Sequence, residues 1–458
     1  MKPILPKGTR DYSPIEVSRR NYMKEKIKLS YEKYGFEPIE TPSFEKLEIL
    51  KGNYSEEGDR LIFKILNSGE KLKKADIQSL KSNKISQFSS SISEKALRYD
   101  LTIPFARYVS KNQNEINFPF KRYQIQPVWR ADRPQYGRFQ EFIQCDADII
   151  GSNSLLLEVD LILLCTEVFK KLGLEFITIK INHRKILYDI SKKIGFKNNF
   201  KDFTTILDKF NKIGSKGVID LLRKENISSS KLSDLKYLLT LDGSNEFKLK
   251  SISKFLGLSF SENSGLNDID KILKNNFIQS SVDFKIDFDL TLARGLDYYT
   301  GSIFEISCSK NDGIGSIGGG GRYDNLASTF GLKKMSGVGI SLGFDRIYLL
   351  MDELDLFPEF LSITTQVLIA NFGTETEQTC MDLLKKLRSK EIRSEFYPDF
   401  IRINNQLSYA DKKNIPYVIM IGKNELESKV FLLKDLKKRE QSSHSINEIL
   451  SVINKKIG

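Results

Sequence analysis

The residues best suited to chemistry lie in one stretch, residues 121–151 (KRYQIQPVWRADRPQYGRFQEFIQCDADIIG). Two runs with strand-like alternation flank a loop that contains Pro134 and Gly137, and this arrangement predicts a long antiparallel hairpin. Three arginines lie around the loop: Arg130, Arg133 and Arg138. Three polar residues follow at alternate positions and therefore share one face of the second strand: Gln144, Asp146 and Asp148. Guanidinium groups at one end and carboxylates further along suit a ligand with phosphates at one end and a cation at the other.

Two further motifs bring arginines and glycines to the same kind of site. An alternating strand over residues 282–290 leads into RGLDYYTG, a turn that begins with Arg294 and is followed by another strand. Four consecutive glycines, Gly318–Gly321, predict a turn where the backbone can approach a ligand closely. Small residues over 337–342 predict a strand that enters a helix through GFDR, which puts Arg346 near a helix N-terminus, where phosphate binding is favoured. A single arginine would be better explained by a solvated ion pair, whereas the arginine hairpin together with RGLDYYTG and GFDR favours a ligand site.

Composition limits the class of protein. The chain has 458 residues, enough for about three domains with a sizeable core. Its net charge of +12 favours a polyanionic partner only weakly. The four cysteines show no CxxC spacing and there are two histidines, which argues against a disulfide framework and a zinc site. A dinucleotide-binding fold and a P-loop are not supported, because neither glycine motif is present in its required context. The apolar runs at the N-terminus and over residues 159–165 are too short for a signal peptide or a membrane span, so we expect a cytoplasmic protein.

The order of the expected elements divides the chain into domains. An α+β domain, with an antiparallel sheet flanked by helices, is expected in two parts, residues 1–184 and 281–356, interrupted by a helical insertion over 185–280. A linker over 357–365 precedes an α/β domain over 366–458, where strands alternate with helices. Ser13 and Glu16 have the spacing of a capping box, which predicts a long helix that ends at Gly35. Residues 97–109 are expected to be extended as far as Pro104, with Asp100 and Thr102 on the same side.

Taken together, the motifs resemble the histidyl-tRNA synthetases, a family of class II aminoacyl-tRNA synthetases. The resemblance rests on these motifs: KGTRDYSP from Lys7, YGFEPIETP from Tyr34, LRYDLT from Leu97, the arginine hairpin, RGLDYYTG from Arg294, GFDR from Gly343, and YADKKNIPYVIMIG from Tyr409. It implies that the α+β domain is a class II catalytic domain and that the tail binds the anticodon. It also implies a homodimer whose substrates are ATP, histidine and histidine tRNA, with Mg²⁺ accompanying ATP. No protein side chain can be named as a metal ligand.

The resemblance also implies a role for individual residues. Arg130 and Arg294 would be catalytic, holding the α-phosphate and the carboxylate, while Arg138 and Arg346 would complete the ATP site. Histidine would be held by Asp100, Leu101, Thr102, Arg130, Gln144, Asp148, Arg294, Tyr298 and Tyr299. Within that set, Asp148 and Tyr299 would read the two imidazole nitrogens, because a carboxylate and a phenol supply a partner for each. Arg133 and Gln135 would face the acceptor end of the tRNA. Asp100 stands where some bacterial members carry a glutamate in a different motif.

Two other functions fit parts of the sequence. A regulatory paralogue of the family would keep the fold and sense histidine without charging tRNA, and a tRNA-binding module would need only the basic charge. Such paralogues typically lose the arginines of the ATP site and the tail. Both features are present here, so we expect the enzyme.

Overall fold

The computed structural model describes residues 2–51, 61–293, 298–311, 313–332 and 335–457. They form two compact units, one comprising Met1–Arg10 with Met23–Leu356 and the other Asp11–Tyr22 with Phe357–Gly458. Within the described residues, no helix combines the length and apolar character needed to cross a bilayer.

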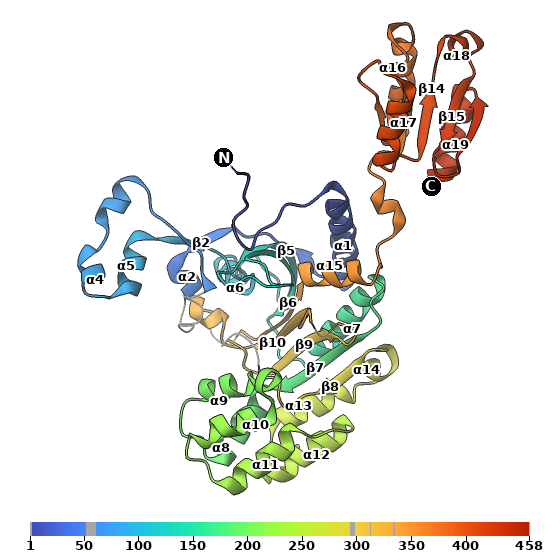
Figure 1. The fold of residues 1–458 in the computed structure, drawn as a ribbon. Coiled ribbons are helices and arrows are strands. Elements are labelled where there is room, and N and C mark those ends of the chain that lie inside the picture. Colours follow the sequence, from blue (N-terminus) through green and yellow to red (C-terminus); the bar gives the residue numbers. More distant parts are fainter. Residues whose placement is uncertain (1, 52–60, 294–297, 312, 333–334, 458) are drawn as a thin grey trace. The chain divides into compact units, whose positions relative to one another are not determined.

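An eight-stranded sheet forms the centre of the first unit, in the order β1-β5-β6-β11-β10-β9-β7-β8 (Figure 1). The strands are β1 (Glu37–Pro38), β5 (Phe120–Trp129), β6 (Glu141–Ile150), β7 (Ile177–His183), β8 (Lys285–Phe288), β9 (Ser302–Cys308), β10 (Gly318–Tyr323) and β11 (Gly337–Gly343). All inner pairs are antiparallel, whereas β1 pairs with β5 and β8 pairs with β7 in parallel. The expectation of an antiparallel sheet is therefore confirmed for the inner strands, whereas the complete sheet is mixed because both edge strands pair in parallel.

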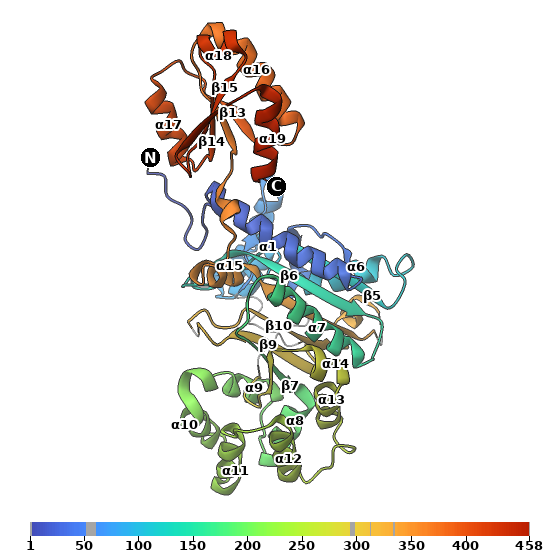
Figure 2. The same cartoon turned by 90° about the vertical axis from the view of Figure 1, so that its right-hand side faces the viewer.

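The predicted arginine hairpin is confirmed as β5 and β6, which pair from Phe120↔Ile150 to Trp129↔Glu141. Alternation gives β6 two different faces. On its apolar face, Cys145, Ala147 and Ile149 are fully buried. The hydroxyl of Tyr31 from helix α1 (Pro14–Lys33) donates to the carbonyl of Cys145 at 2.9 Å. Figure 2 shows α1 and α7 (Leu156–Lys171) on this same face of the sheet. The opposite face of β6 carries the polar residues.

Helix α1 begins with the predicted capping box. The amide of Ser13 donates to Glu16 Oε2 at 2.7 Å, and the amide of Glu16 donates to Ser13 Oγ at 3.3 Å. These two bonds satisfy amides that have no partner inside the helix.

The first unit contains further elements outside the insertion. They are α2 (Leu47–Lys51), η1 (Gly69–Lys74), α4 (Ile77–Lys81), α5 (Ile85–Ile92), α6 (Thr102–Lys111), η2 (Ala327–Phe330), α15 (Phe344–Glu353) and a small sheet of β2 (Phe44–Lys46), β3 (Lys64–Ile65) and β4 (Lys95–Leu97).

The expectation of an extended segment up to Pro104 is wrong. The strand ends at Leu97, and helix α6 begins at Thr102. Proline is tolerated in the first turn of a helix because amides there have no intrahelical partner. The carboxylate of Asp100 accepts from the amide of Ile103 at 3.3 Å, as a capping residue does.

The four glycines over 318–321 lie in strand β10 and do not form the predicted turn. Glycine has low strand propensity, so the local sequence does not predict this strand. Packing requires it, since a Cβ at Gly320 would lie 2.1 Å from the carbonyl oxygen of Gly339 and one at Gly321 would lie 2.4 Å from that of Ser302. The glycines thus allow the three central strands to lie together.

Seven helices connect β7 to β8 and pack at that edge of the sheet (Figures 1 and 2). They are α8 (Arg184–Ile194), α9 (Phe200–Leu207), α10 (Phe210–Arg223), α11 (Ser229–Leu239), α12 (Asn245–Leu256), α13 (Ser264–Leu273) and α14 (Asn276–Ser281). The side chain of Asn245 bonds to the backbone of Ile286 and Phe288, both at 2.8 Å, so it occupies the open edge of β8.

The second unit contains a five-stranded sheet in the order β13-β12-β14-β15-β16. The first three strands are parallel, as alternating strands and helices predicted, and the last two add an antiparallel hairpin that was not predicted. Its elements are η3 (Glu359–Ser362), β12 (Val367–Ile369), α16 (Thr374–Ser389), β13 (Ser394–Phe396), α17 (Ile403–Lys412), β14 (Tyr417–Met420), α18 (Lys423–Ser428), β15 (Phe431–Asp435), β16 (Glu440–His444) and α19 (Ile446–Ile457). Helices α16 and α19 pack on one face of the sheet and α17 packs on the other.

Candidate active site

A cavity of about 340 Å³ opens on the polar face of the central strands. Residues from β6, β9, β10 and β11 line it, together with the hairpin loop and the start of α15. It brings together nine of the predicted site residues: Asp100, Thr102, Arg130, Arg138, Gln144, Asp148, Tyr298, Tyr299 and Arg346. They come from segments up to 246 residues apart in the sequence, so the sheet is what assembles them.

The other four predicted residues do not line the cavity. Leu101 is fully buried beside it, and its carbonyl accepts from Arg122 at 3.4 Å. Arg133 and Gln135 are exposed in the loop between β5 and β6. Arg294 lies outside the described residues.

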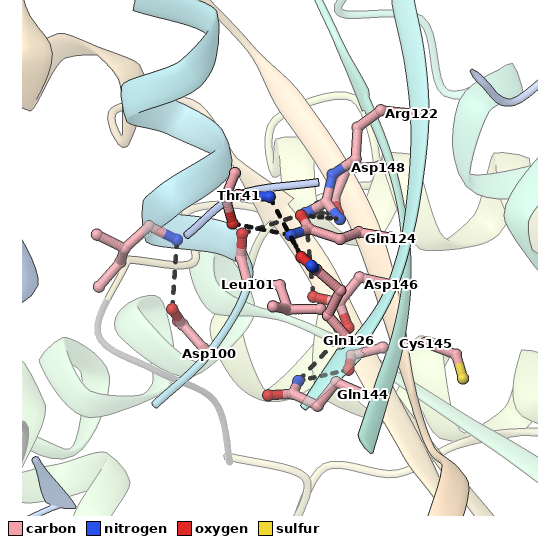
Figure 3. Close-up of polar contacts among 12 residues, drawn as sticks. Thr41, Asp100, Leu101, Arg122, Gln124, Gln126, Gln144, Cys145, Asp146 and Asp148 are labelled. Atoms are coloured by element: carbon pink, nitrogen blue, oxygen red, sulfur yellow. Dashed lines mark hydrogen bonds and ion pairs between the residues drawn. The ribbon is translucent and has the colours of Figure 1, made fainter. Parts of the chain in front are cut away.

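Asp148 is held by two buried groups that the sequence did not suggest as site residues. Arg122 forms an ion pair with Asp148 Oδ2 at 2.7 Å (Figure 3). The hydroxyl of Tyr323 donates to Asp148 Oδ1 at 2.6 Å. The guanidinium also lies 4.4 Å from the ring of Phe105. Arg122 and Asp148 are paired in the register of the hairpin, which is the signal that could have identified this arginine. Burial nevertheless raises the pKa of Asp148, and Arg122 and Tyr323 oppose that rise.

Asp100 lines the cavity, and one of its carboxylate oxygens has no hydrogen-bond partner among the described residues. Its side chain is 1% exposed, and Oδ1 accepts from the amide of Ile103. Oδ2 is buried and makes no hydrogen bond to any described residue. Burial raises the pKa of Asp100 to about 6. An unsatisfied buried acceptor is energetically costly, which makes the carboxylate of Asp100 a candidate acceptor for a ligand donor.

Arg130 and Gln144 lie next to each other at the middle of the cavity. Arg130 Nε donates to the carbonyl of Tyr99 at 2.9 Å, and its guanidinium lies 5.2 Å from the ring centre of Phe142. A terminal nitrogen of Arg130 donates to Gln144 Oε1 at 3.4 Å. The backbone bond and the ring restrict the arginine, while its remaining donors can bind an anion.

Two tyrosines, Tyr298 and Tyr299, line the cavity together with the carboxylates of Asp100 and Asp148. The rings of Tyr298 and Tyr299 meet edge to face with centroids 4.8 Å apart. Burial raises the pKa of both phenols above the ordinary value, so both stay neutral. A neutral phenol can donate to or accept from an imidazole nitrogen.

The arginines at the other end belong to α15 and the hairpin loop. Arg346 Nε donates to the carbonyl of Gly137 at 2.8 Å, and Nη1 donates to the carbonyl of Ser316. Asp345 Oδ2 accepts from the amide of Ile143 at 2.8 Å, which ties the start of α15 to β6. Arg138 is exposed at the rim. The cavity therefore has a cationic end and an anionic end.

No cluster of three or more potential metal ligands occurs among the residues that the structure describes. Magnesium usually keeps several waters and binds through one or two carboxylates together with substrate phosphates. Glu305 of β9 lines the cavity and is an oxygen ligand of that type.

Comparison with known proteins assigns the family. A histidyl-tRNA synthetase family model matches residues 81–347, more than half of the chain, and an anticodon binding domain model matches residues 366–456. The chain is similar to histidine–tRNA ligase of Christiangramia forsetii (51% identical, covering 97% of this chain and 98% of that protein) and to that of Flavobacterium johnsoniae (49% identical, covering 96% and 97%). Its fold is similar to the crystal structure of histidyl-tRNA synthetase from Nostoc sp. PCC 7120, with a TM-score of 0.82, 28% identity and full coverage of both chains. The chain belongs to the histidyl-tRNA synthetase family.

Proposed function

We propose that this chain activates histidine with ATP and transfers the histidyl group to the 3′ end of histidine tRNA. The observation that carries the proposal is the single cavity with a cationic end and an anionic end. Such a cavity suits a substrate pair in which ATP brings phosphates and histidine brings an ammonium group. The 51% identity to a histidine–tRNA ligase over nearly the whole chain supports the same reaction.

The anionic end would bind histidine. Asp100 Oδ2, the hydroxyl of Thr102 and Gln144 Oε1 are oxygen acceptors for an ammonium group, which has three donors. Asp148 would accept from one imidazole nitrogen, and Tyr299 would contact the other. Tyr298 supports this arrangement through its ring contact with Tyr299.

The cationic end would bind ATP and stabilise the transition state. The carboxylate of histidine attacks the α-phosphate, and pyrophosphate leaves; the 3′ hydroxyl of the tRNA then attacks the histidyl-adenylate, and AMP leaves. No protein nucleophile is needed, so catalysis consists of positioning and charge stabilisation. Arg130 and Arg294 would bind the α-phosphate and the carboxylate, and Arg138 and Arg346 the rest of ATP. Mg²⁺ would bind through the outer phosphates, with Glu305 as a candidate ligand, and would neutralise part of their charge.

Further parts of the proposal concern the tRNA and the assembly. Residues 366–458 would bind the anticodon, and Arg133 and Gln135 would contact the acceptor end. We also propose a cytoplasmic homodimer. Membership of the histidyl-tRNA synthetase family supports the dimer. Sedimentation of the full chain measures the mass directly.

The regulatory alternative is not favoured. The curated relatives that match nearly the whole chain are histidine–tRNA ligases. The ATP phosphoribosyltransferase regulatory subunit/histidyl-tRNA synthetase from Bacillus halodurans C is 21% identical, and its similarity shows only a shared fold.

Amino-acid-dependent exchange of pyrophosphate with ATP, run with all twenty amino acids, tests the proposal. We expect exchange with histidine and charging of histidine tRNA. Exchange with another amino acid, or histidine binding without exchange, would reject it. An Arg294→Ala variant that folds should still bind histidine and lose on the order of 100-fold or more in exchange rate. Normal exchange in that variant would remove Arg294 from the catalytic set.

A further inference from the structure

The side-chain amide of Gln144 is fixed by two neighbours on the wall of the cavity. Its Nε2 donates to Ser341 Oγ at 2.6 Å. It also donates to Asp146 Oδ1 at 3.4 Å (Figure 3). Its Oε1 lies on the other side, where Arg130 donates to it at 3.4 Å. Gln144, Asp146 and Ser341 all line the cavity, and Asp146 is 1% exposed.

The register of the sheet puts the three residues together. Asp146 of β6 is directly opposite Ser341 of β11, so their side chains share one face. Gln144 lies two residues before Asp146 and has the same orientation. Arg122 lies behind this group, with a guanidinium nitrogen 4.0 Å from Asp146 Oδ2. Arg122 therefore contacts one oxygen of the Asp146 carboxylate while Gln144 contacts the other.

The hydrogen bonds around Gln144 favour one orientation of the amide. Ser341 Oγ accepts from Nε2 of Gln144 at 2.6 Å, and Asp146 Oδ1 accepts from it at 3.4 Å. Burial raises the pKa of Asp146 to about 7, and Arg122 opposes that rise, so above this pH the carboxylate is ionised and only accepts hydrogen bonds. On the other side of the amide, Arg130 has only donors to offer, and it donates to Oε1 of Gln144. The oxygen of Gln144 therefore faces Arg130 and the cavity.

We propose that Asp146 and Ser341 are positioning residues, which keep the amide oxygen of Gln144 directed at the ammonium group of histidine. The inference rests on the proposed function, in which Gln144 binds that group. If the amide were reversed, its N–H donors would face an ammonium group that has no acceptor. A glutamine alone does not specify this orientation, because its two ends have nearly the same shape.

Asp146→Asn tests the inference, because asparagine has the same shape and can donate from its own NH₂. The amide of Gln144 can then reverse. Two ligands separate the effects: histidinol carries the ammonium and the imidazole, whereas 3-(imidazol-4-yl)propanoate lacks the ammonium. Calorimetry on the full-length protein measures both affinities. We expect Asp146→Asn to weaken histidinol binding about 10- to 150-fold, the range of a lost hydrogen bond to a charged group, and to change propanoate binding less than about 2-fold. Ser341→Ala should act in the same direction with a smaller effect.

A second substitution should restore binding. Both oxygens of a glutamate accept, so in Asp146→Asn/Gln144→Glu the new asparagine can donate to one oxygen while the other faces the ammonium. We expect this double variant to bind histidinol several-fold more tightly than Asp146→Asn alone. Ser336→Ala is the matched control, because this buried serine precedes β11 and bonds to Arg322 at 2.7 Å and to Asp324 at 2.6 Å, away from Gln144. It should leave the affinity ratio of the two ligands unchanged.

Equal weakening of both ligands by Asp146→Asn, no weakening of either, or no recovery in the double variant would each overturn the inference. A different result would reject the proposed function, namely the absence of histidine-dependent pyrophosphate exchange by the unaltered chain, which is measured separately. A chain that binds histidinol through an oriented Gln144 and shows no exchange would retain this inference and lose the proposed reaction.

Discussion

Tyr323→Phe removes one hydrogen bond from Asp148 and keeps the aromatic ring. The hydroxyl of Tyr323 donates to Asp148 Oδ1 at 2.6 Å, and both residues are buried. A hydrogen bond to a charged group contributes about 1.5–3 kcal/mol, which corresponds to a factor of about 10 to 150 in an equilibrium constant. The bond stabilises the ionised carboxylate, and its loss raises the pKa of Asp148 further. Arg122 remains at 2.7 Å, so the carboxylate keeps its position.

We therefore expect the KM for histidine in pyrophosphate exchange to rise by up to about 100-fold, while the KM for ATP stays within about 2-fold. The defect should shrink as the pH is raised, because a higher pH restores the ionised carboxylate. Tyr31→Phe is the matched control, since the hydroxyl of Tyr31 is also buried and donates to the carbonyl of Cys145 on the apolar face of the same strand. It should lower stability without changing the KM for histidine. Equal effects of the two substitutions on that KM would refute the reasoning.

Three further predictions concern the cavity and the domains. A Cβ at Gly339 would lie 1.9 Å from Asp148 Oδ1, so Gly339→Ala should displace the carboxylate and raise the KM for histidine about 10- to 100-fold, as measured by exchange. Burial raises the pKa of Asp100 to about 6, above its ordinary value of about 3.9, so the folded state binds the proton more tightly than the unfolded state does. The contribution of this group to the free energy of unfolding should therefore fall as the pH rises from about 4 to about 6, and Asp100→Asn should reduce that pH dependence in urea titrations. A chain that ends near Pro358 and remains a folded dimer should form histidyl-adenylate and charge tRNA poorly, and full charging by this chain would contradict the proposed role of the tail.

Local sequence signals predicted the elements whose partners are close in the chain. The capping box of Ser13 and Glu16 and the alternation along the hairpin depend on neighbouring residues, and both are confirmed. Alternation along the strand also predicted that Gln144, Asp146 and Asp148 share one face. The small-residue strand and the helix that carries Arg346 followed from the same kind of signal.

Predictions failed where distant contacts override local preference. Glycine has low strand propensity, yet Gly318–Gly321 form a central strand because larger residues would collide with the neighbouring strands. Pro104 suggested an extended segment, but it is compatible with the first turn of α6. Arg122 was not predicted as a site residue, and it is fully buried against Phe105. The sequence alone does not show what covers a strand face.

The sequence by itself indicated which residues could carry the chemistry, because guanidinium, carboxylate and phenol groups have fixed charges and donor patterns. It also determined which of them share a strand face, because side chains alternate along a strand. Only the tertiary structure decided that segments around residues 100, 144, 298 and 346 line one cavity, that Arg122 and Tyr323 hold Asp148, and that Ser341 lies opposite Asp146. The physical reason is that these relations depend on strand order and register, which are set by packing across the whole sheet and by no single stretch of the chain.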